Sequence, residues 1–162
     1  MRVLARPLPF LSLLGGLLLA IALPATAQSE EVTLVVSQGS ESRRLSLEEI
    51  ERTGLHHVEM HHPEGPEGRF SGVWLDAFLA DQGLDEARRV RFIAHDDYTT
   101  FLTPAQRDAK AYLLVTRLDG APLARDYLGP FMLVVPADVE AVRRGSEPMS
   151  RWIWAIREVS AL

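Results

Sequence analysis

Hydrophobic residues occur along most of the chain in short runs, separated by clusters that contain Gly, Pro and Asp, with one longer apolar run near the start. Short runs that are rich in β-branched and aromatic residues, bounded by turn-forming residues, predict β-strands. The strands expected by this criterion are 32–36, 56–62, 90–94, 111–117, 131–135 and 152–159. In the last of them Trp152, Trp154 and Ile156 alternate with other residues and are expected on one face.

Helices are expected between these strands. Ser46 with Glu49, and Thr103 with Gln106, have the spacing of capping boxes, in which the first residue and the one three positions later bond reciprocally. Apolar residues at helical spacing predict a further helix, which ends at Gly83, with a buried face formed by Trp74, Leu75, Phe78 and Leu79. Residues 137–144 also look helical. Short strands mixed with short helices indicate a single α+β domain with mixed or antiparallel β-sheets.

The longer apolar run belongs to the first 27 residues. Two arginines, Arg2 and Arg6, precede it, and it ends in Ala25-Thr26-Ala27, which places small residues at the −3 and −1 positions of a cut after Ala27. This is the pattern of a secretory signal peptide. We therefore expect residues 1–27 to be removed and residues 28–162 to form the mature domain, located in a bacterial periplasm.

Charge and cysteine content narrow the possible functions. The chain of 162 residues has a formal net charge of −5, which becomes −7 once the two arginines of the signal peptide are removed. An acidic protein is a poor binder of nucleic acid or anionic membranes, and no second apolar segment predicts membrane insertion after cleavage. The chain contains no cysteine, so disulfides, thiolate metal ligands and cysteine nucleophiles are excluded.

Five short motifs follow one another from residue 70 to the C-terminus: Phe70–Leu79, Ala94–Tyr98, Leu118–Leu123, Gly129–Pro136 and Trp152–Trp154. Their order and spacing resemble those of the oxidoreductase molybdopterin-binding domain, the sulfite oxidase fold, in its small secreted form. The resemblance covers nearly all of the mature chain. It implies a sulfite-oxidase-like fold and, in catalytic members of the family, a molybdenum centre with oxidoreductase activity.

The same resemblance shows where the chain departs from catalytic members. They hold molybdenum through a pterin dithiolene and one cysteine, which the resemblance places near Met60 and His61, and this chain has none. A neutral imidazole is not an equivalent of the soft, charged thiolate. The usual Asp-Gly-Tyr motif reads Asp96-Asp97-Tyr98, and the added carboxylate would repel the phosphate of a pterin. We therefore expect no cofactor, with molybdopterin as the alternative that the resemblance implies.

The export signal agrees with that expectation. Proteins that receive a pterin–molybdenum cofactor normally load it in the cytoplasm and leave folded, through a twin-arginine signal. In this chain Arg2 and Arg6 are separated by three residues, so the arginine pair is missing. The chain is expected to cross the membrane unfolded and to arrive without cofactor.

Four of the five histidines lie between His56 and His62. On a strand, His57, Glu59 and His61 would share one face, and two imidazoles with one carboxylate form a ligand set for zinc, copper or nickel. The other interpretation of this segment is a solvated strand end. The sequence leaves both open.

A second group of candidates follows the buried strand 90–94, where loops often carry functional residues. A ligand-binding groove there would be lined by Asp96, Asp97 and Tyr98, with Gly129 and Pro130 close by. An Asx-type turn that only closes the strand end is the structural alternative. Trp152 and Trp154 are expected in the core, or else as one wall of a ligand pocket.

These observations lead to one main hypothesis and two alternatives. The main hypothesis is a periplasmic binding or accessory protein that recognises a small-molecule ligand or the periplasmic domain of a membrane protein. The first alternative is a molybdopterin-dependent oxidoreductase. The second is a metal-binding protein that uses the histidine cluster.

Overall fold

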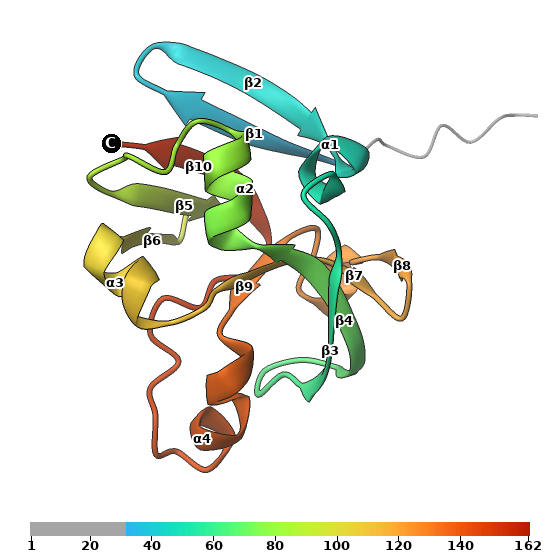
Figure 1. Ribbon diagram of the computed structural model, residues 1–162. Helices are drawn as coiled ribbons and strands as arrows, with labels where there is room; N and C mark the ends of the chain where they lie inside the picture. Colours follow the sequence, from blue (N-terminus) through green and yellow to red (C-terminus); the bar gives the residue numbers. More distant parts are fainter. Residues whose placement is uncertain (1–31) are drawn as a thin grey trace, which may run out of the picture. The chain divides into compact units, whose positions relative to one another are not determined.

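Two β-sheets joined by short helices make up the computed structural model, which describes residues 32–162 (Figure 1). One sheet has the strand order β2-β1-β10-β5-β6, and the other has the order β3-β4-β7-β8 with β9 paired to β7. Figure 1 shows the first sheet in the upper half of the view and the second below it. The predicted signal peptide, residues 1–27, lies outside the described residues.

The first sheet is mixed. Its strands are β1 (Thr33–Gln38), β2 (Glu41–Ser46), β5 (Val90–Ala94), β6 (Thr99–Leu102) and β10 (Ile156–Ala161). β1 and β10 run parallel, and the other neighbours are antiparallel. Along β5, Val90, Phe92 and Ala94 are buried and alternate with less buried residues, because successive side chains of a strand point to opposite faces.

The second sheet is antiparallel throughout its named pairs. Its strands are β3 (His56–His61), β4 (Glu67–Trp74), β7 (Leu113–Leu118), β8 (Ala121–Pro122) and β9 (Met132–Val134). Asp119 and Gly120 form the turn between β7 and β8, and both have positive φ. This is the conformation that tight hairpin turns require.

Short helices connect the strands. They are α1 (Leu47–Glu51), α2 (Leu75–Asp81), α3 (Pro104–Ala109) and α4 (Val139–Arg143), with 3-10 turns η1 (Arg125–Tyr127) and η2 (Pro136–Asp138). Both predicted capping boxes are present, at α1 and at α3. Leu75, Phe78 and Leu79 form the buried face of α2, and Trp74 is its half-buried N-cap. Residues 32–162 belong to one unit, so the expected α+β domain with mixed and antiparallel sheets is confirmed.

The last predicted strand was placed too early, and several strands were not predicted. Residues 152–155 are not part of a strand, and β10 begins only at Ile156, because Arg151 and Ala155 adopt positive φ. Trp152, Trp154 and Ile156 therefore do not form one strand face. Strands β2, β4, β6 and β8 were not expected at all. Gly68 and Gly72 interrupt the hydrophobic pattern of β4, and β8 has only two residues. β2 is an edge strand whose first four residues are exposed, so it has no alternation of hydrophobic residues to reveal it, and β6 has only four residues.

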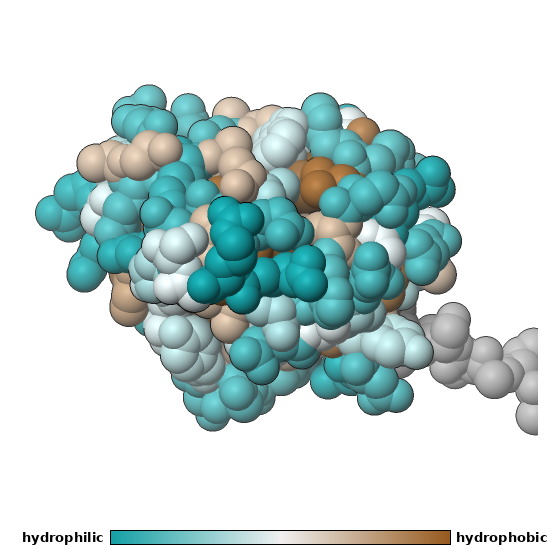
Figure 2. Space-filling model, turned by 90° about the horizontal axis from the view of Figure 1, so that it is seen from below, coloured by the Kyte–Doolittle hydropathy of each residue, from teal (hydrophilic) through white to brown (hydrophobic). Residues whose placement is uncertain are grey.

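The core consists mainly of fully buried aromatic and aliphatic side chains, among them Phe70, Phe78, Phe92 and Phe131. Hydrophobic residues reach the surface in Figure 2 only as small, separate patches on a mostly hydrophilic face. Within residues 32–162, no helix combines the length and the hydrophobicity needed to span a bilayer.

Candidate functional site

A pocket of about 310 Å³ lies between the turn that follows β5 and the irregular segment that precedes β10. Besides Ala94 at the end of β5, it is lined by Asp96, Tyr98, Met149, Trp152, Ile153 and Trp154. This volume is at the lower end of the range of about 300–1,000 Å³ that is usual for small-molecule sites. The pocket therefore suits a small ligand.

The turn on one side of the pocket is held by its own hydrogen bonds. The backbone N–H of Tyr98 donates to Oδ1 of Asp96 (3.1 Å), and the N–H of Ala94 donates to the carbonyl of Tyr98 (2.9 Å). Asp97 lies between them with φ of 68°. This arrangement is the expected Asx turn, and it leaves the side chain of Tyr98 56% exposed.

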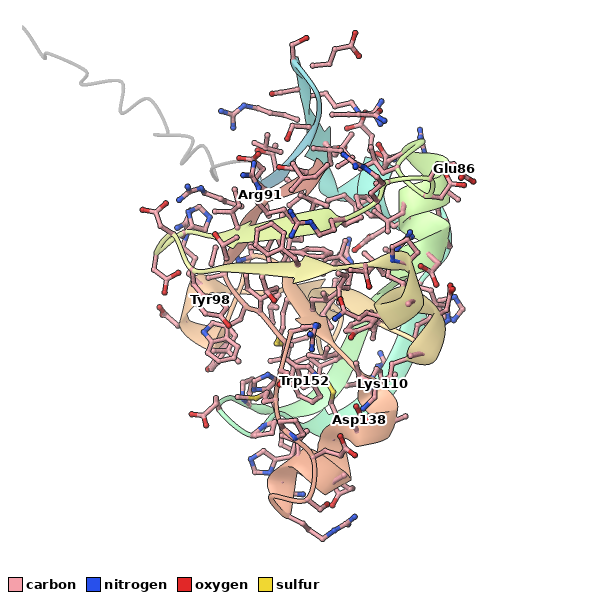
Figure 3. All side chains as sticks on the ribbon, turned by 90° about the vertical axis from the view of Figure 1, so that its left-hand side faces the viewer. Glu86, Arg91, Tyr98, Lys110, Asp138 and Trp152 are labelled. Carbon is pink, nitrogen blue, oxygen red and sulfur yellow. The ribbon has the colours of Figure 1, made fainter. Side chains whose placement is uncertain are left out.

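The opposite wall is the segment that carries the two tryptophans. Ile153 is fixed by a backbone bridge to Leu133, with N–H to carbonyl distances of 2.7 and 3.2 Å. On either side of this bridge Trp152 is buried and Trp154 is half-buried. Figure 3 shows Tyr98 beyond the end of β5, with Trp152 below it and nearer the centre of the view. The alternative expectation for the tryptophans, a pocket wall, agrees with this geometry.

His62 lies against this tryptophan wall and is completely buried. Its ring centroid is 5.6 Å from that of Trp152 and 5.7 Å from that of Trp154. The N–H of Glu64 donates to Nδ1 of His62 (3.1 Å), so the proton of the neutral ring belongs on Nε2, which has no hydrogen-bond partner. Burial, with a smaller contribution from His61, lowers the pKa of His62 from 6.5 to about 4. The imidazole is therefore neutral at pH 7.

His62 was not among the expected site residues. The available signal was its register, because His62 alternates with Met60 and Val58 on the face of the strand opposite to His57. Met60 and His62 are buried in the structure, whereas His57 and Glu59 are exposed. The position of His62 on the buried face, just before Pro63, therefore marks it as the histidine of this segment that contacts the core.

Asp96 and Asp97 have different electrostatic surroundings. Arg157 binds Asp97, with 2.7 Å between Nη2 and Oδ1, and its other terminal nitrogen donates to the carbonyl of His95. Asp96 has no ion-pair partner within the described residues 32–162. It is also the one charged residue among those that line the pocket. The carboxylate at the pocket is thus the one without a counter-ion.

The structure brings only part of the predicted groove together. Asp96 and Tyr98 line the pocket, whereas Asp97 forms the ion pair with Arg157. Gly129 and Pro130 are buried, joined by a cis peptide bond, and are not among the residues that line this pocket. Met149, Trp152 and Trp154 occupy the wall instead.

The histidine strand has the predicted alternation, but its side chains contact other groups. Nδ1 of His57 lies 2.8 Å from Oγ of Ser71, and Nδ1 of His61 lies 3.7 Å from a carboxylate oxygen of Glu67. Glu59 is exposed. Across the part of the chain that the structure describes, no three His, Asp or Glu side chains are placed so that they could hold a metal ion.

The residues at this site do not fit a molybdenum–pterin group. Met60 is buried on β3 and His61 is half-buried, so the position that the resemblance assigns to the thiolate ligand offers no soft anionic donor. The pocket between Tyr98 and Trp154 has a carboxylate and no Lys or Arg among its lining residues. A pterin phosphate would therefore meet a negative charge without a compensating cation.

Replacing Asp97 by glycine is expected to change the free energy of unfolding by less than about 1 kcal/mol. Glycine relieves the positive φ of this position, while the exposed pair with Arg157 that it loses contributes only about 0–1 kcal/mol. Asp97→Ala loses the same pair without relieving φ and should be less stable than Asp97→Gly. Urea unfolding of both variants checks this. Equal, large losses would show that the carboxylate itself holds the turn.

Comparisons with known proteins support the fold. No family model matches the chain, and no curated protein matches it. Among solved structures, it is similar to the sulfane dehydrogenase SoxCD from Paracoccus pantotrophus, with 15% sequence identity and a TM-score of 0.54. The match covers 80% of this chain and 37% of that one, so the chain spans well under half the length of its structural neighbour. The two proteins have distantly related folds. This similarity confirms the expected sulfite-oxidase-like fold.

Proposed function

We propose that this protein is a periplasmic binding or accessory protein, which uses a sulfite-oxidase-like fold without molybdenum chemistry and takes a small ligand in the pocket between Tyr98 and Trp154. The observation that carries the proposal is the composition of that pocket. Aromatic and aliphatic side chains line it together with a single carboxylate, and no nucleophile with an adjacent base is among the lining residues. Such a lining is suited to holding a ligand rather than to transforming it.

Two features of the sequence support the proposal that the protein contains no molybdenum. The chain has no cysteine, and its export signal lacks the arginine pair. The similarity to SoxCD supports a shared architecture, but function depends on the site that a fold carries. The molybdopterin-dependent oxidoreductase remains the competing proposal, and the cofactor content of the native protein separates the two.

The test uses protein purified from its native compartment. Intact-mass analysis is expected to find a chain that starts at Gln28, and metal analysis is expected to find no stoichiometric molybdenum. About one molybdenum per chain, together with pterin fluorescence after acid oxidation, would overturn the proposal in favour of the oxidoreductase. Full-length chain in a membrane fraction would contradict the export part alone.

Binding is tested separately through the tryptophans of the pocket. A small-molecule library with cationic, anionic and neutral members is screened against the mature protein by tryptophan fluorescence. At least one class is expected to change the emission in the wild type and not in Tyr98→Ala. Tyr127→Ala is the matched control, because Tyr98 and Tyr127 are 56% and 53% exposed and only Tyr98 lines the pocket. A library without any Tyr98-dependent response would overturn the binding function.

A further inference from the structure

We propose that the pocket formed by Asp96, Tyr98, Trp152 and Trp154 selects a small organic cation of the quaternary ammonium class. This inference rests on the proposed binding function and specifies its ligand. Three features carry it, namely the aromatic walls, the unpaired carboxylate and the lack of any positive charge among the lining residues.

The aromatic walls provide the attraction. Two indole rings and one phenol ring line a space of about 310 Å³, together with the thioether of Met149. Aromatic faces carry partial negative charge, and tryptophan attracts cations most strongly. Tyr98 belongs to the turn after β5 and the tryptophans to the segment before β10, so the rings come from separate parts of the chain. Rings on different sides of a small space form the type of aromatic cage that recognises methylated ammonium groups.

Asp96 provides the matching charge. Its Oδ1 accepts the N–H of Tyr98, which fixes the carboxylate at the rim, and no cationic side chain of residues 32–162 pairs with it. The neighbouring Asp97 is neutralised by Arg157. A carboxylate that faces a pocket without a protein counter-ion favours a cationic ligand and disfavours an anionic one.

The histidine behind the tryptophan wall adds no positive charge to the pocket. His62 packs against both indoles, and its complete burial keeps the imidazole neutral at pH 7. A charged imidazole there would repel a cation in the cage. Ala94, Met149 and Ile153 complete the lining and have no side chain that donates a hydrogen bond, so they offer apolar contacts. Such contacts suit the methyl groups of a methylated cation, while Asp96 matches its charge.

Choline and 3,3-dimethylbutan-1-ol form a matched pair of probes, because they have the same shape and differ in the charge. We expect choline to bind the mature protein at least tenfold more tightly than the alcohol, measured by calorimetry and by tryptophan fluorescence. A tenfold ratio corresponds to about 1.4 kcal/mol. Tetramethylammonium should compete with choline, and acetate should not.

Variants locate the effect. Asp96→Asn keeps an oxygen that can accept the N–H of Tyr98 and removes the charge, so it should weaken choline binding about tenfold and leave the binding of the alcohol unchanged. Asp97→Asn is the matched control and should change neither by more than about twofold. Tyr98→Phe should retain choline binding, whereas Tyr98→Ala should lose most of it.

The outcomes separate this inference from the proposed function. Equal affinity for choline and the alcohol, or equal losses in Asp96→Asn and Asp97→Asn, would overturn cation selection. If choline does not bind while a neutral or anionic compound gives a Tyr98-dependent fluorescence response, the binding function stands and the quaternary ammonium ligand is wrong. If no compound binds, both are wrong.

Discussion

Replacing Gly129 by alanine is expected to destabilise the protein by about 3 kcal/mol or more, at the upper end of the cost of overpacking. A Cβ atom at this buried position would lie 2.6 Å from the carbonyl oxygen of Ala124, and the carbonyl oxygen of Leu123 would be closer still. Both are backbone atoms, which cannot rotate away. The melting temperature should fall by roughly 10 °C or more, as expected for a domain of this size.

The damage should extend to the pocket. The N–H of Gly129 donates to the carbonyl of Ala124 (2.9 Å), and the carbonyl of Leu128, one residue earlier, accepts the N–H of Ala155 beside Trp154 (2.9 Å). A shift of this turn therefore moves the tryptophan segment, and any folded Gly129→Ala protein should show altered tryptophan emission.

Gly68→Ala is the control for this substitution. Its added Cβ would lie 2.9 Å from Cδ1 of Leu118 and 3.0 Å from the carboxylate oxygens of Asp119. These are side-chain atoms, which can move at the cost of one exposed hydrogen bond, from the N–H of Arg69 to Asp119. We expect a loss of less than about 1 kcal/mol for Gly68→Ala. Similar melting temperatures for the two variants would contradict the argument from backbone contact.

Acidification from pH 7 to pH 4.5 is expected to lower the free energy of unfolding by about 2–3 kcal/mol through His62 alone. In the unfolded chain this histidine takes up a proton as the pH falls through about 6.5. In the folded protein burial lowers its pKa to about 4, so it stays neutral over most of this range. The unfolded state therefore binds more protons, and stability falls as the pH decreases between these two values.

Comparison with a variant that does not titrate isolates this contribution from that of other groups. Asn at position 62 provides an oxygen that can accept the N–H of Glu64, the bond that Nδ1 of His62 receives. His62→Asn should be less stable at pH 7, because it leaves a space beside the tryptophans, but its stability should depend less on pH. Urea unfolding of both proteins at pH 7, 6, 5 and 4.5 measures the difference. Parallel pH profiles would show that His62 does not control acid stability.

The sequence alone was sufficient for elements whose signals are local. The capping boxes at Ser46 and Thr103 and the buried face of α2 depend on residues a few positions apart in the sequence. Both capping boxes were predicted, as were Leu75, Phe78 and Leu79 on the buried face. The fold class also followed, because alternating short strands and helices leave few ways to bury their apolar faces. Strands β2, β4 and β6 were not predicted. The exposed edge strand β2 and the four-residue β6 have no hydrophobic period, and Gly68 and Gly72 interrupt the pattern of β4.

The candidate site was only half visible in the sequence. Asp96 and Tyr98 could be selected because they follow a buried strand, which is a local signal. Trp152 and Trp154 line the same pocket. Their position depends on the backbone bridge between Ile153 and Leu133, which joins two segments that are distant along the chain.

The differences between similar residues were decided by tertiary contacts. Arg157 neutralises Asp97 and leaves Asp96 without a counter-ion, although the two carboxylates are neighbours in the sequence. His62 is buried against two indoles, while His57 on the preceding strand β3 stays exposed. Charge state and burial depend on which groups approach from elsewhere in the fold, so the residue types alone could not distinguish these pairs.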